Sequence, residues 1–401
     1  MRRYHLALPL LSCFMIQMIA CSPTSTTYTI QASNSGDFER KAETIEMPLE
    51  TFDNFSAEQY HNLAIEDDRG KGIPIQLIDM NQDSVFDRLI FQTDFEPGQT
   101  KTFRLTSEKN KGVKVADSIR TFCRIVPERM DDFAWENDKV AFRSYGPKCQ
   151  ELFQAGDPTG LISSGIDCWT KRVAYPIIDK WYREDKNGKS YHEDHGEGLD
   201  TYHVGTTRGC GGTALVQANQ YILSQNFISW KVLANGPIRS VFELAYAPIV
   251  TGNTVVAEKK RITLDLGAHL YHCQVSYTAR NPLDTAAAGI ALHQGQGKIT
   301  SNPVEGWLAY WEPLGDSYLG TAILADPNSI TNLVASDTLY QDESRNNMWM
   351  HIKIEKHGFN YWAGFGWRKS GDFHAAEDWE NYLKMESAKK RNPIQVKTFK
   401  D

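Results

Sequence analysis

The chain has 401 residues, of which 41% are hydrophobic and 11% aromatic, and its formal net charge at pH 7 is −7. This length is ample for a large core and exceeds the usual size of a single domain. The negative charge and the lack of a basic run give no reason to expect a nucleic-acid partner, so any anionic ligand must be held by a local group of cations.

Residues 1–20 are predicted to be a lipoprotein signal peptide. Two arginines precede an apolar stretch, Leu6 to Ala20, that is too short to span a bilayer comfortably. A small residue followed by Cys21 resembles a bacterial lipobox, which implies cleavage before Cys21 and acylation of its thiol. An ordinary secretion signal cut nearby is the alternative. Ser22 resembles outer-membrane sorting and residues 21–28 form a tether, so we expect a lipid anchor on the periplasmic side of the outer membrane.

A small N-terminal β-domain is predicted over residues 29–108. Residues 73–78 and 85–95 flank a polar turn and are typical of a hairpin. The segment 109–117 is polar and rich in Gly and Lys, so we place the domain boundary there. Residues 118–401 are assigned to a large catalytic domain.

The larger domain is predicted to be an antiparallel β-sandwich. Long β-type runs separated by Gly-containing turns cover residues 240–249, 255–266 and 270–279. Apolar and polar residues alternate in the last two runs, which indicates strands with one buried face. Convincing helices are few, and the best covers residues 375–385. The expected fold class is therefore mainly β, with a supersandwich-like antiparallel β-sandwich and a small N-terminal β-domain.

The turn of the predicted hairpin imitates the start of an EF-hand calcium loop. Oxygen-bearing side chains stand at positions 1, 3, 5 and 9 of such a loop, namely Asp79, Asn81, Asp83 and Asp87. Position 6 is Ser84 where the loop needs glycine, and position 12 is Ile90 where it needs a bidentate glutamate. Since Asn and Asp also make good hairpin turns, calcium is a weak candidate, and we expect no other cofactor.

A candidate sugar subsite lies in residues 126–147, VPERMDDFAWENDKVAFRSYGP. An indole can take the apolar face of a sugar ring, carboxylate and amide groups can bind hydroxyls, and a guanidinium can bind a uronate. The side chains of these kinds are Trp135, Glu136, Asn137 and Arg143. In the alternative interpretation the tryptophan belongs to the core and the charges form a solvated rim. The 10 tryptophans of the chain favour carbohydrate binding.

Residues 191–212, YHEDHGEGLDTYHVGTTRGCGG, combine acid/base groups and glycines more densely than any other part of the chain. His195 and His203 can take or give a proton, Tyr202 is a candidate acid, and Arg208 offers a fork for a carboxylate. A metal site and a purely structural loop are the alternatives. The HxxH spacing is a weak metal signal because the glycines exclude a helix. Proton-transfer chemistry is the preferred interpretation.

These two motifs, together with GPIRSVFELAY and GFGWRKSGDFHAAEDWENYL, resemble the family described as domain of unknown function 4861. The resemblance covers nearly all of the chain after the leader. Members of that family occur as exported proteins in polysaccharide-utilisation systems of marine and gut bacteria, and a related enzyme of ulvan breakdown is an oligosaccharide dehydratase. The resemblance implies an anionic, uronic-acid-containing and sulfated oligosaccharide as substrate. It also implies that water is removed from the 4-position of a non-reducing-end glucuronic or iduronic acid, upstream of an unsaturated glucuronyl hydrolase.

The chemistry of this elimination assigns roles to the residues. A cation must neutralise the carboxylate before the C5 proton can leave, which is a role for Arg143 or Arg208. A base and an acid must then move protons, and His195 and Tyr202 are predicted to be that pair. Further substrate contacts are expected from Trp135, Glu136, Asn137 and His203.

Other functions use the same residues differently. A polysaccharide lyase follows the same steps with a sugar as the leaving group. A glycoside hydrolase would need two carboxylates, for which Glu136 with Glu197 or Asp200 is available. A non-catalytic sugar-binding lipoprotein would explain the aromatic residues and the anchor. If the residue 191–212 segment is scaffold, His293 or His351 becomes the better catalytic candidate.

Overall fold

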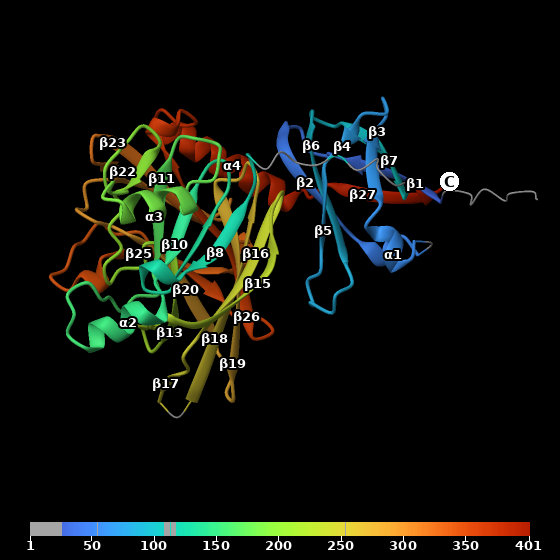
Figure 1. Ribbon diagram of the computed structural model, residues 1–401. Helices are drawn as coiled ribbons and strands as arrows, with labels where there is room; N and C mark the ends of the chain where they lie inside the picture. Colours follow the sequence, from blue (N-terminus) through green and yellow to red (C-terminus); the bar gives the residue numbers. More distant parts are fainter. Residues whose placement is uncertain (1–25, 54, 108–112, 114–117, 253) are drawn as a thin grey trace, which may run out of the picture.

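The computed structural model describes residues 26–401 except residues 54, 108–112, 114–117 and 253. The predicted signal peptide, Cys21 and most of the tether therefore lie outside the described residues. The chain is mainly β, as predicted, and forms a small body of N-terminal strands beside a larger sandwich (Figure 1). Within the described ranges, no helix combines the length and the apolar character needed to cross a bilayer.

The small body has two sheets around its own core, in which Ile30, Phe91 and Phe103 are buried. One sheet has the order β27 (Gln395–Lys400), β1 (Thr27–Ser33), β7 (Thr100–Ser107), β3 (Leu63–Asp67) and β4 (Gly72–Ile73). The other has the order β2 (Arg40–Pro48), β6 (Arg88–Phe95) and β5 (Ile75–Ile78), and β5 and β6 form the predicted hairpin. A 3-10 turn and a short helix connect β2 to β3, namely η1 (Leu49–Thr51) and α1 (Ala57–Tyr60).

The C-terminal strand corrects the predicted extent of the large domain. β27 pairs antiparallel with β1 from Tyr28↔Lys400 to Ser33↔Gln395. The sandwich therefore ends before residue 395, and the last strand completes the sheet of the small body (Figure 1). The sequence did not predict this pairing because β1 and β27 lie at opposite ends of the described chain, and strand partners in an antiparallel sheet need not be neighbours in the sequence.

The large body has two layers. One layer is a nine-stranded sheet in the order β15 (Phe227–Asn235), β16 (Arg239–Tyr246), β18 (Thr254–Asp265), β19 (Leu270–Ala279), β26 (Gly358–Trp367), β23 (Ser317–Leu324), β22 (Trp307–Leu314) and β21 (Lys298–Asn302), with β17 (Ile249–Thr251) paired to β18. The other layer contains β12 (Gly198–Asp200), β11 (Ile166–Lys171), β10 (Ala141–Ser144), β9 (Asp132–Glu136) and β8 (Phe122–Val126), and a second sheet of β14 (Gln220–Ile222), β13 (Cys210–Gln217), β20 (Thr285–Ala291), β25 (Asn347–Lys353) and β24 (Ile330–Val334).

Both five-stranded sheets pack against the nine-stranded sheet through one core. The expected alternation is present in β18 and β19, where Ile262, Leu264, Tyr271 and Cys273 are buried in that core. The residues between them face outward, so the outer surface of the nine-stranded sheet is largely polar at these strands. The predicted β-sandwich is confirmed.

Helices cover the outer faces of the layers. The predicted helix over residues 375–385 is α4 (Ala376–Arg391), whose Trp379 and Leu383 are buried on the outer face of the nine-stranded sheet. On the other layer, α3 (Ile178–Lys186) places Trp181 on Trp169 of β11, with ring centroids 5.5 Å apart. The remaining helical elements are η2 (Pro127–Arg129), α2 (Pro147–Gln154), η3 (Pro327–Ser329), η4 (Glu343–Arg345) and η5 (Arg368–Ser370).

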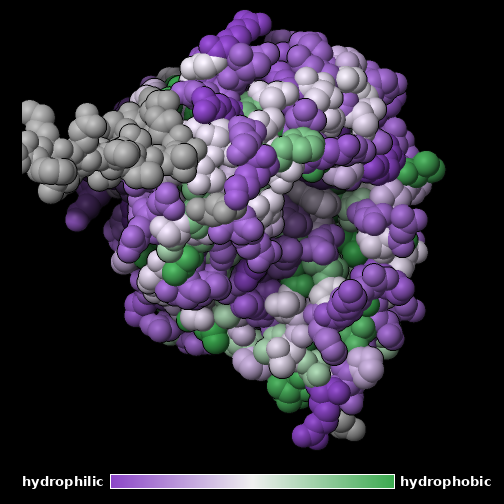
Figure 2. Space-filling model, turned by 90° about the vertical axis from the view of Figure 1, so that its right-hand side faces the viewer, coloured by the Kyte–Doolittle hydropathy of each residue, from purple (hydrophilic) through white to green (hydrophobic). Residues whose placement is uncertain are grey.

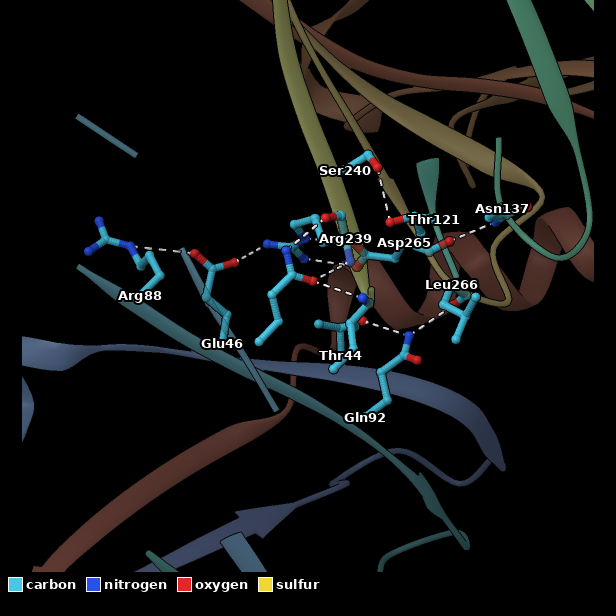
Figure 3. Close-up of polar contacts among 12 residues, drawn as sticks. Thr44, Glu46, Arg88, Gln92, Thr121, Asn137, Arg239, Ser240, Asp265 and Leu266 are labelled. Atoms are coloured by element: carbon cyan, nitrogen blue, oxygen red, sulfur yellow. Dashed lines mark hydrogen bonds and ion pairs between the residues drawn. The ribbon is translucent and has the colours of Figure 1, made fainter. Parts of the chain in front are cut away.

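A ladder of polar contacts joins the small body to the sandwich (Figure 3). Arg239 of β16 makes a two-point ion pair with Asp265 of β18 at 2.5 and 2.8 Å, and it also contacts Glu46 of β2. Gln92 of β6 donates to the carbonyl oxygen of Leu266 at 2.8 Å. Burial opposes ionisation of Asp265, but the Arg239 guanidinium outweighs it and holds the pKa of Asp265 below its usual value.

The calcium candidates form a turn that binds its own backbone. The Asp79 carboxylate accepts the N–H groups of Gln82 and Ser84 at 2.6 and 2.8 Å. Backbone N–H groups of the same turn are also accepted by Asn81, Asp83 and Asp87. Such contacts are what short acidic and amide side chains do in turns. No group of three metal-ligating side chains is assembled anywhere in the described ranges, and calcium binding stays a prediction.

Candidate functional site

The predicted sugar subsite of residues 135–137 is part of the interior. Trp135 is fully buried and stacks on Phe142 with ring centroids 5.4 Å apart. The Glu136 carboxylate accepts the Lys171 ammonium at 2.8 Å and the two backbone N–H groups that begin α3. The Asn137 amide donates to two backbone carbonyl oxygens at 2.7 Å. This placement corrects the predicted sugar contacts, because the polar groups are already satisfied away from solvent.

Arg143 lies on the outer face of β10 among three buried aspartates. Its Nη2 is 2.7 Å from Asp167 and 3.0 Å from Asp200, and its Nε is 3.8 Å from Asp132. Burial, together with the neighbouring Asp200, raises the pKa of Asp167 to about 7, and burial raises the pKa of Asp132 to about 6. The charge of Arg143 is thus used inside the protein, which corrects its predicted role as the uronate-binding cation.

His195 and Tyr202 have different surroundings. His195 is near the surface, where its Nε2 lies 3.0 Å from the carbonyl oxygen of Ser190. Tyr202 is buried, and its hydroxyl has no hydrogen-bond partner in the described residues. Its ring packs edge-on against the His293 ring, with centroids 4.6 Å apart. Burial raises the pKa of Tyr202 well above its usual value. No hydrogen bond, ion pair or ring contact among the described residues joins the two side chains, which corrects the predicted proton-transfer pair.

His203 contacts the loop of residues 335–346 between β24 and β25, and His293 in turn contacts His203. The exposed His203 places Nε2 2.8 Å from Glu343 of this loop. His293 is held at both ring nitrogens, with Nδ1 2.7 Å from Glu312 and Nε2 2.7 Å from the carbonyl oxygen of His203. Because both nitrogens are occupied, His293 acts as a brace rather than as a free base.

Arg208 is buried behind the same loop. No carboxylate of the described chain lies within ion-pairing distance, and its guanidinium donates to Ser164 at 2.9 Å and to the carbonyl oxygen of Thr206 at 3.0 Å. Burial lowers the pKa of Arg208 to about 10, a sign of a poorly compensated charge. The fork predicted for a substrate carboxylate is thus not accessible. The aliphatic part of the Arg208 side chain and the Trp349 indole both lie over Gly289. A Cβ atom added at Gly289 would be 2.7 Å from Cγ of Arg208 and 3.0 Å from the indole, so the two side chains are close together.

A cavity of about 590 Å³ opens on the outer face of the β14-β13-β20-β25-β24 sheet. Strand alternation builds its floor, because Met348 and Met350 of β25 are in the core and Trp349 lies on the opposite face. The loop of residues 335–346 forms its rim. The lining side chains that bear on chemistry are Asn219, Tyr221, Tyr340, Ser344, Arg345 and Trp349.

Tyr221 joins the floor of the cavity to a histidine. Its ring is stacked on Trp349 with centroids 4.0 Å apart and planes 7° apart. The Tyr221 hydroxyl lies 2.8 Å from Nε2 of His351, which follows Trp349 by two residues on the same face of β25. Burial raises the pKa of Tyr221 to about 12 and lowers the pKa of His351. At neutral pH the pair is therefore a phenol beside a neutral imidazole, which can pass a proton between them.

Arg345 supplies a cation at the rim of the cavity. Its guanidinium lies 3.7 Å from the ring centroid of Tyr340 and forms no ion pair with any described residue. An exposed guanidinium without a carboxylate partner can bind an incoming carboxylate through two hydrogen bonds. The cavity thus holds an aromatic floor that includes Tyr221, hydroxyl and amide groups, and a free cation, and His351 adjoins it as the hydrogen-bond partner of Tyr221.

Tyr221, Arg345 and Trp349 were missed in the sequence, and His351 was only a reserve candidate. A signal existed in NMWMHIK, where period two places Trp349 and His351 on one face and the methionines on the other. Tyr221 carries no such signal, because it reaches the pair from the short strand β14, which pairs with β13.

Residues 32–396 match the family model described as domain of unknown function (DUF4861). A protein of Formosa agariphila named "Uncharacterized protein P7" is 38% identical over 370 residues, which is 92% of each chain. Among solved structures, an alpha-mannosidase from Enterococcus faecalis V583 is similar in fold, with 9% identity, a TM-score of 0.50 and coverage of 93% of this chain and 46% of that chain. A glycosyl hydrolase family 38 protein from Enterococcus faecalis gives 9% identity and a TM-score of 0.49, covering 94% and 48%.

The chain therefore spans about half the length of these solved structures. At 9% identity, the likeness to the alpha-mannosidase concerns the fold alone. The family match and the Formosa agariphila relative, in contrast, extend over most of the chain. The chain belongs to the DUF4861 family.

Proposed function

We propose that the protein is an oligosaccharide dehydratase that eliminates water from a non-reducing-end glucuronic or iduronic acid of ulvan-type oligosaccharides. The observation that carries this proposal is the free Arg345 guanidinium in one cavity with Tyr221, whose hydroxyl is hydrogen-bonded to His351. Elimination next to a carboxylate needs a cation to neutralise the acid and two groups to move protons. The sequence motifs supply the substrate class.

In the proposed reaction, Arg345 binds the uronate carboxylate, and the buried charge of Arg208 adds to the positive potential nearby. His351 first takes the phenolic proton of Tyr221, and the Tyr221 oxygen, which lines the cavity, then takes the C5 proton; the C4–O bond breaks, and a double bond forms between C4 and C5. Tyr221 gives its phenolic proton to the departing hydroxyl, which leaves as water. The proton on His351 then returns to Tyr221 across their 2.8 Å contact, which restores both groups.

The Tyr221 ring stacked on Trp349 gives this site a sugar-binding surface. A flat aromatic floor suits the apolar face of a pyranose, and Asn219 and Ser344 offer amide and hydroxyl groups for its hydroxyls. The substrate is accordingly an anionic oligosaccharide, with the unsaturated product passing to an unsaturated glucuronyl hydrolase. Acylation at Cys21 would hold the enzyme at the periplasmic face of the outer membrane.

Product analysis tests the proposal. The full chain is incubated with ulvan-type oligosaccharides, and the products are followed by mass spectrometry and short-wave ultraviolet absorbance. Loss of one water with a new conjugated double bond and no chain shortening is the expected result. Shortening together with the double bond would identify a polysaccharide lyase, a gained reducing end without a double bond a hydrolase, and unchanged oligosaccharides a binding protein.

A further inference from the structure

A second groove lies far from the Tyr221 cavity, on the outer face of the nine-stranded sheet. Three hollows of about 410, 710 and 300 Å³ adjoin there, and each is lined by Trp362 of β26. Residues of the small body, including Glu46 and Arg88, line the first hollow. Figure 2 shows this side of the molecule hollowed, with mainly hydrophilic residues around the depression.

Polar side chains of two neighbouring strands form the floor of this groove. In the register of β19 and β26, His272 is opposite Trp362 and Gln274 is opposite Asn360. The His272 and Trp362 rings are stacked with centroids 4.6 Å apart and planes 17° apart. Within the part of the chain that the structure describes, the polar groups of these four side chains have no hydrogen-bond partner. The floor therefore offers an aromatic surface and unused hydrogen-bonding groups.

The charges of the inner rim, in contrast, are already paired with one another. Arg239 is held by Asp265 and Glu46, and Arg88 lies 3.5 Å from Glu46 (Figure 3). Lys390, whose ammonium lies 5.0 Å from the centre of the Trp362 ring, is 3.8 Å from Glu386. An ion-paired cation binds an added anion weakly, because the existing pair must first be broken.

His272 is uncharged in this setting. Burial, with the nearby cations Lys390 and Arg239, lowers the pKa of His272 to about 4. At neutral pH its imidazole offers one donor and one acceptor, as a sugar hydroxyl requires. Amides, a neutral imidazole and an indole are the groups that recognise uncharged polyhydroxylated rings.

We propose that this groove is a second saccharide-binding site, which takes an uncharged run of sugar units on the Trp362 surface. The Tyr221 cavity has a free cation and suits an acidic sugar. At the Trp362 floor, in contrast, Arg239 and Lys390 are paired with carboxylates, and the cations without an ion pair among the described residues, Lys356 and Arg391, line only the outer hollows, so the floor suits a neutral sugar. The ion-pair ladder between the two bodies fixes one wall of the groove before any ligand arrives. This inference depends on binding alone and stands apart from the proposed elimination.

Calorimetric titration of the full chain with cellotetraose, xylotetraose and tetragalacturonate tests the proposal. At least one neutral tetrasaccharide is expected to bind, and Trp362→Ala is expected to weaken that binding about tenfold or more by removing the stacking surface. Trp230→Ala, which alters an exposed tryptophan outside the groove, is the matched control and should leave affinity unchanged. Tyr221→Phe should also retain this binding.

A double variant, Gln274→Ala with Asn360→Ala, covers the case in which Trp362→Ala fails to fold, because both positions are exposed. This double variant should bind the neutral tetrasaccharide more weakly, while its thermal unfolding temperature stays unchanged. The proposal is overturned if neither neutral tetrasaccharide binds, or if the groove variants bind it as the parent does. It is equally overturned if tetragalacturonate is the ligand that these variants lose.

Discussion

The Tyr221 hydroxyl lies 2.8 Å from Nε2 of His351, while the tyrosine ring is clamped on Trp349 at 4.0 Å. Because the stacking fixes the ring, the phenolic oxygen is held in one position, beside His351 and in the lining of the cavity. An acid in an elimination needs this arrangement, since the proton must be delivered to one atom of a bound substrate. The pair is therefore the part of the site that mutation probes most directly.

Tyr221→Phe is expected to lower kcat by roughly 10²- to 10⁴-fold, the usual contribution of one general acid or base. The ring and its stacking on Trp349 remain, so oligosaccharide affinity should change little. Tyr202→Phe is the matched control, because that hydroxyl is buried and has no partner among described residues. Formation of the unsaturated uronate is measured by ultraviolet absorbance. Near-normal turnover in Tyr221→Phe would exclude this tyrosine as the acid.

Arg345→Gln is expected to raise KM roughly 10- to 100-fold, because a charge-assisted hydrogen bond to the carboxylate is lost. Arg345→Lys keeps the charge but loses the fork, so it should recover only part of the affinity. Arg69→Gln, an exposed arginine of the small body, is the control. The parent enzyme should also lose affinity as salt rises, and Arg345→Gln should show a weaker salt dependence. Equal KM values for Arg345→Gln and the parent would rule out carboxylate binding here.

His195→Ala is expected to leave turnover within about twofold of the parent, in line with an ordinary surface substitution. Among the described residues, the polar contacts of its Nε2 are the Ser190 carbonyl oxygen and the Glu193 carboxylate, and neither belongs to the Tyr221 cavity. Steady-state kinetics on the same oligosaccharide decide the matter. If His195→Ala loses as much turnover as Tyr221→Phe, the catalytic centre lies in residues 191–212 instead.

The sequence predicted the layers of this fold better than its site. Alternation in residues 262–266 and 271–277 follows from the period of a strand, which is local, and it is found in β18 and β19. The cavity instead joins Tyr221 of β14 to His351 of β25, residues that are far apart in the chain. No spacing rule connects them, because the sheet order that brings them together is set by tertiary packing.

The density of charged residues in 126–147 and 191–212 also misled the prediction of the site. Arg143, Glu136 and Asp200 are buried under α3, where they bind one another or the backbone. A buried ion network and a ligand site use the same residue types, and composition cannot distinguish them. Burial is the property that separates the two, and the structure supplies it.

Deleting residues 394–401 is expected to lower the free energy of unfolding of the small body by about 2 kcal/mol or more. Ile394 and Val396 pack against its core, and β27 pairs with β1 along the whole strand. The loss also exposes the edge of β1, which favours aggregation. Lys397→Ala is the control, since this side chain of β27 is exposed. Calorimetry should show a lower unfolding temperature only in the deletion variant. An unchanged unfolding temperature would contradict a stabilising role for β27.

Asp167→Asn is expected to flatten the pH dependence of stability between about pH 4 and pH 7. Burial, together with Asp200, raises the pKa of Asp167 from its ordinary 3.8 to about 7, so the folded chain keeps a proton that the unfolded chain releases. Because the folded state binds more protons in this window, the Asp167 contribution makes stability fall as pH rises. The amide cannot titrate, so that decline is absent from the variant.

His272 contributes to the pH dependence of stability with the opposite sign, since its pKa is lowered to about 4, but it does so equally in both proteins. Urea unfolding at several pH values gives the difference between parent and variant, with the exposed Asp68→Asn as control. Parallel curves for parent and Asp167→Asn would show that Asp167 is ionised throughout the window.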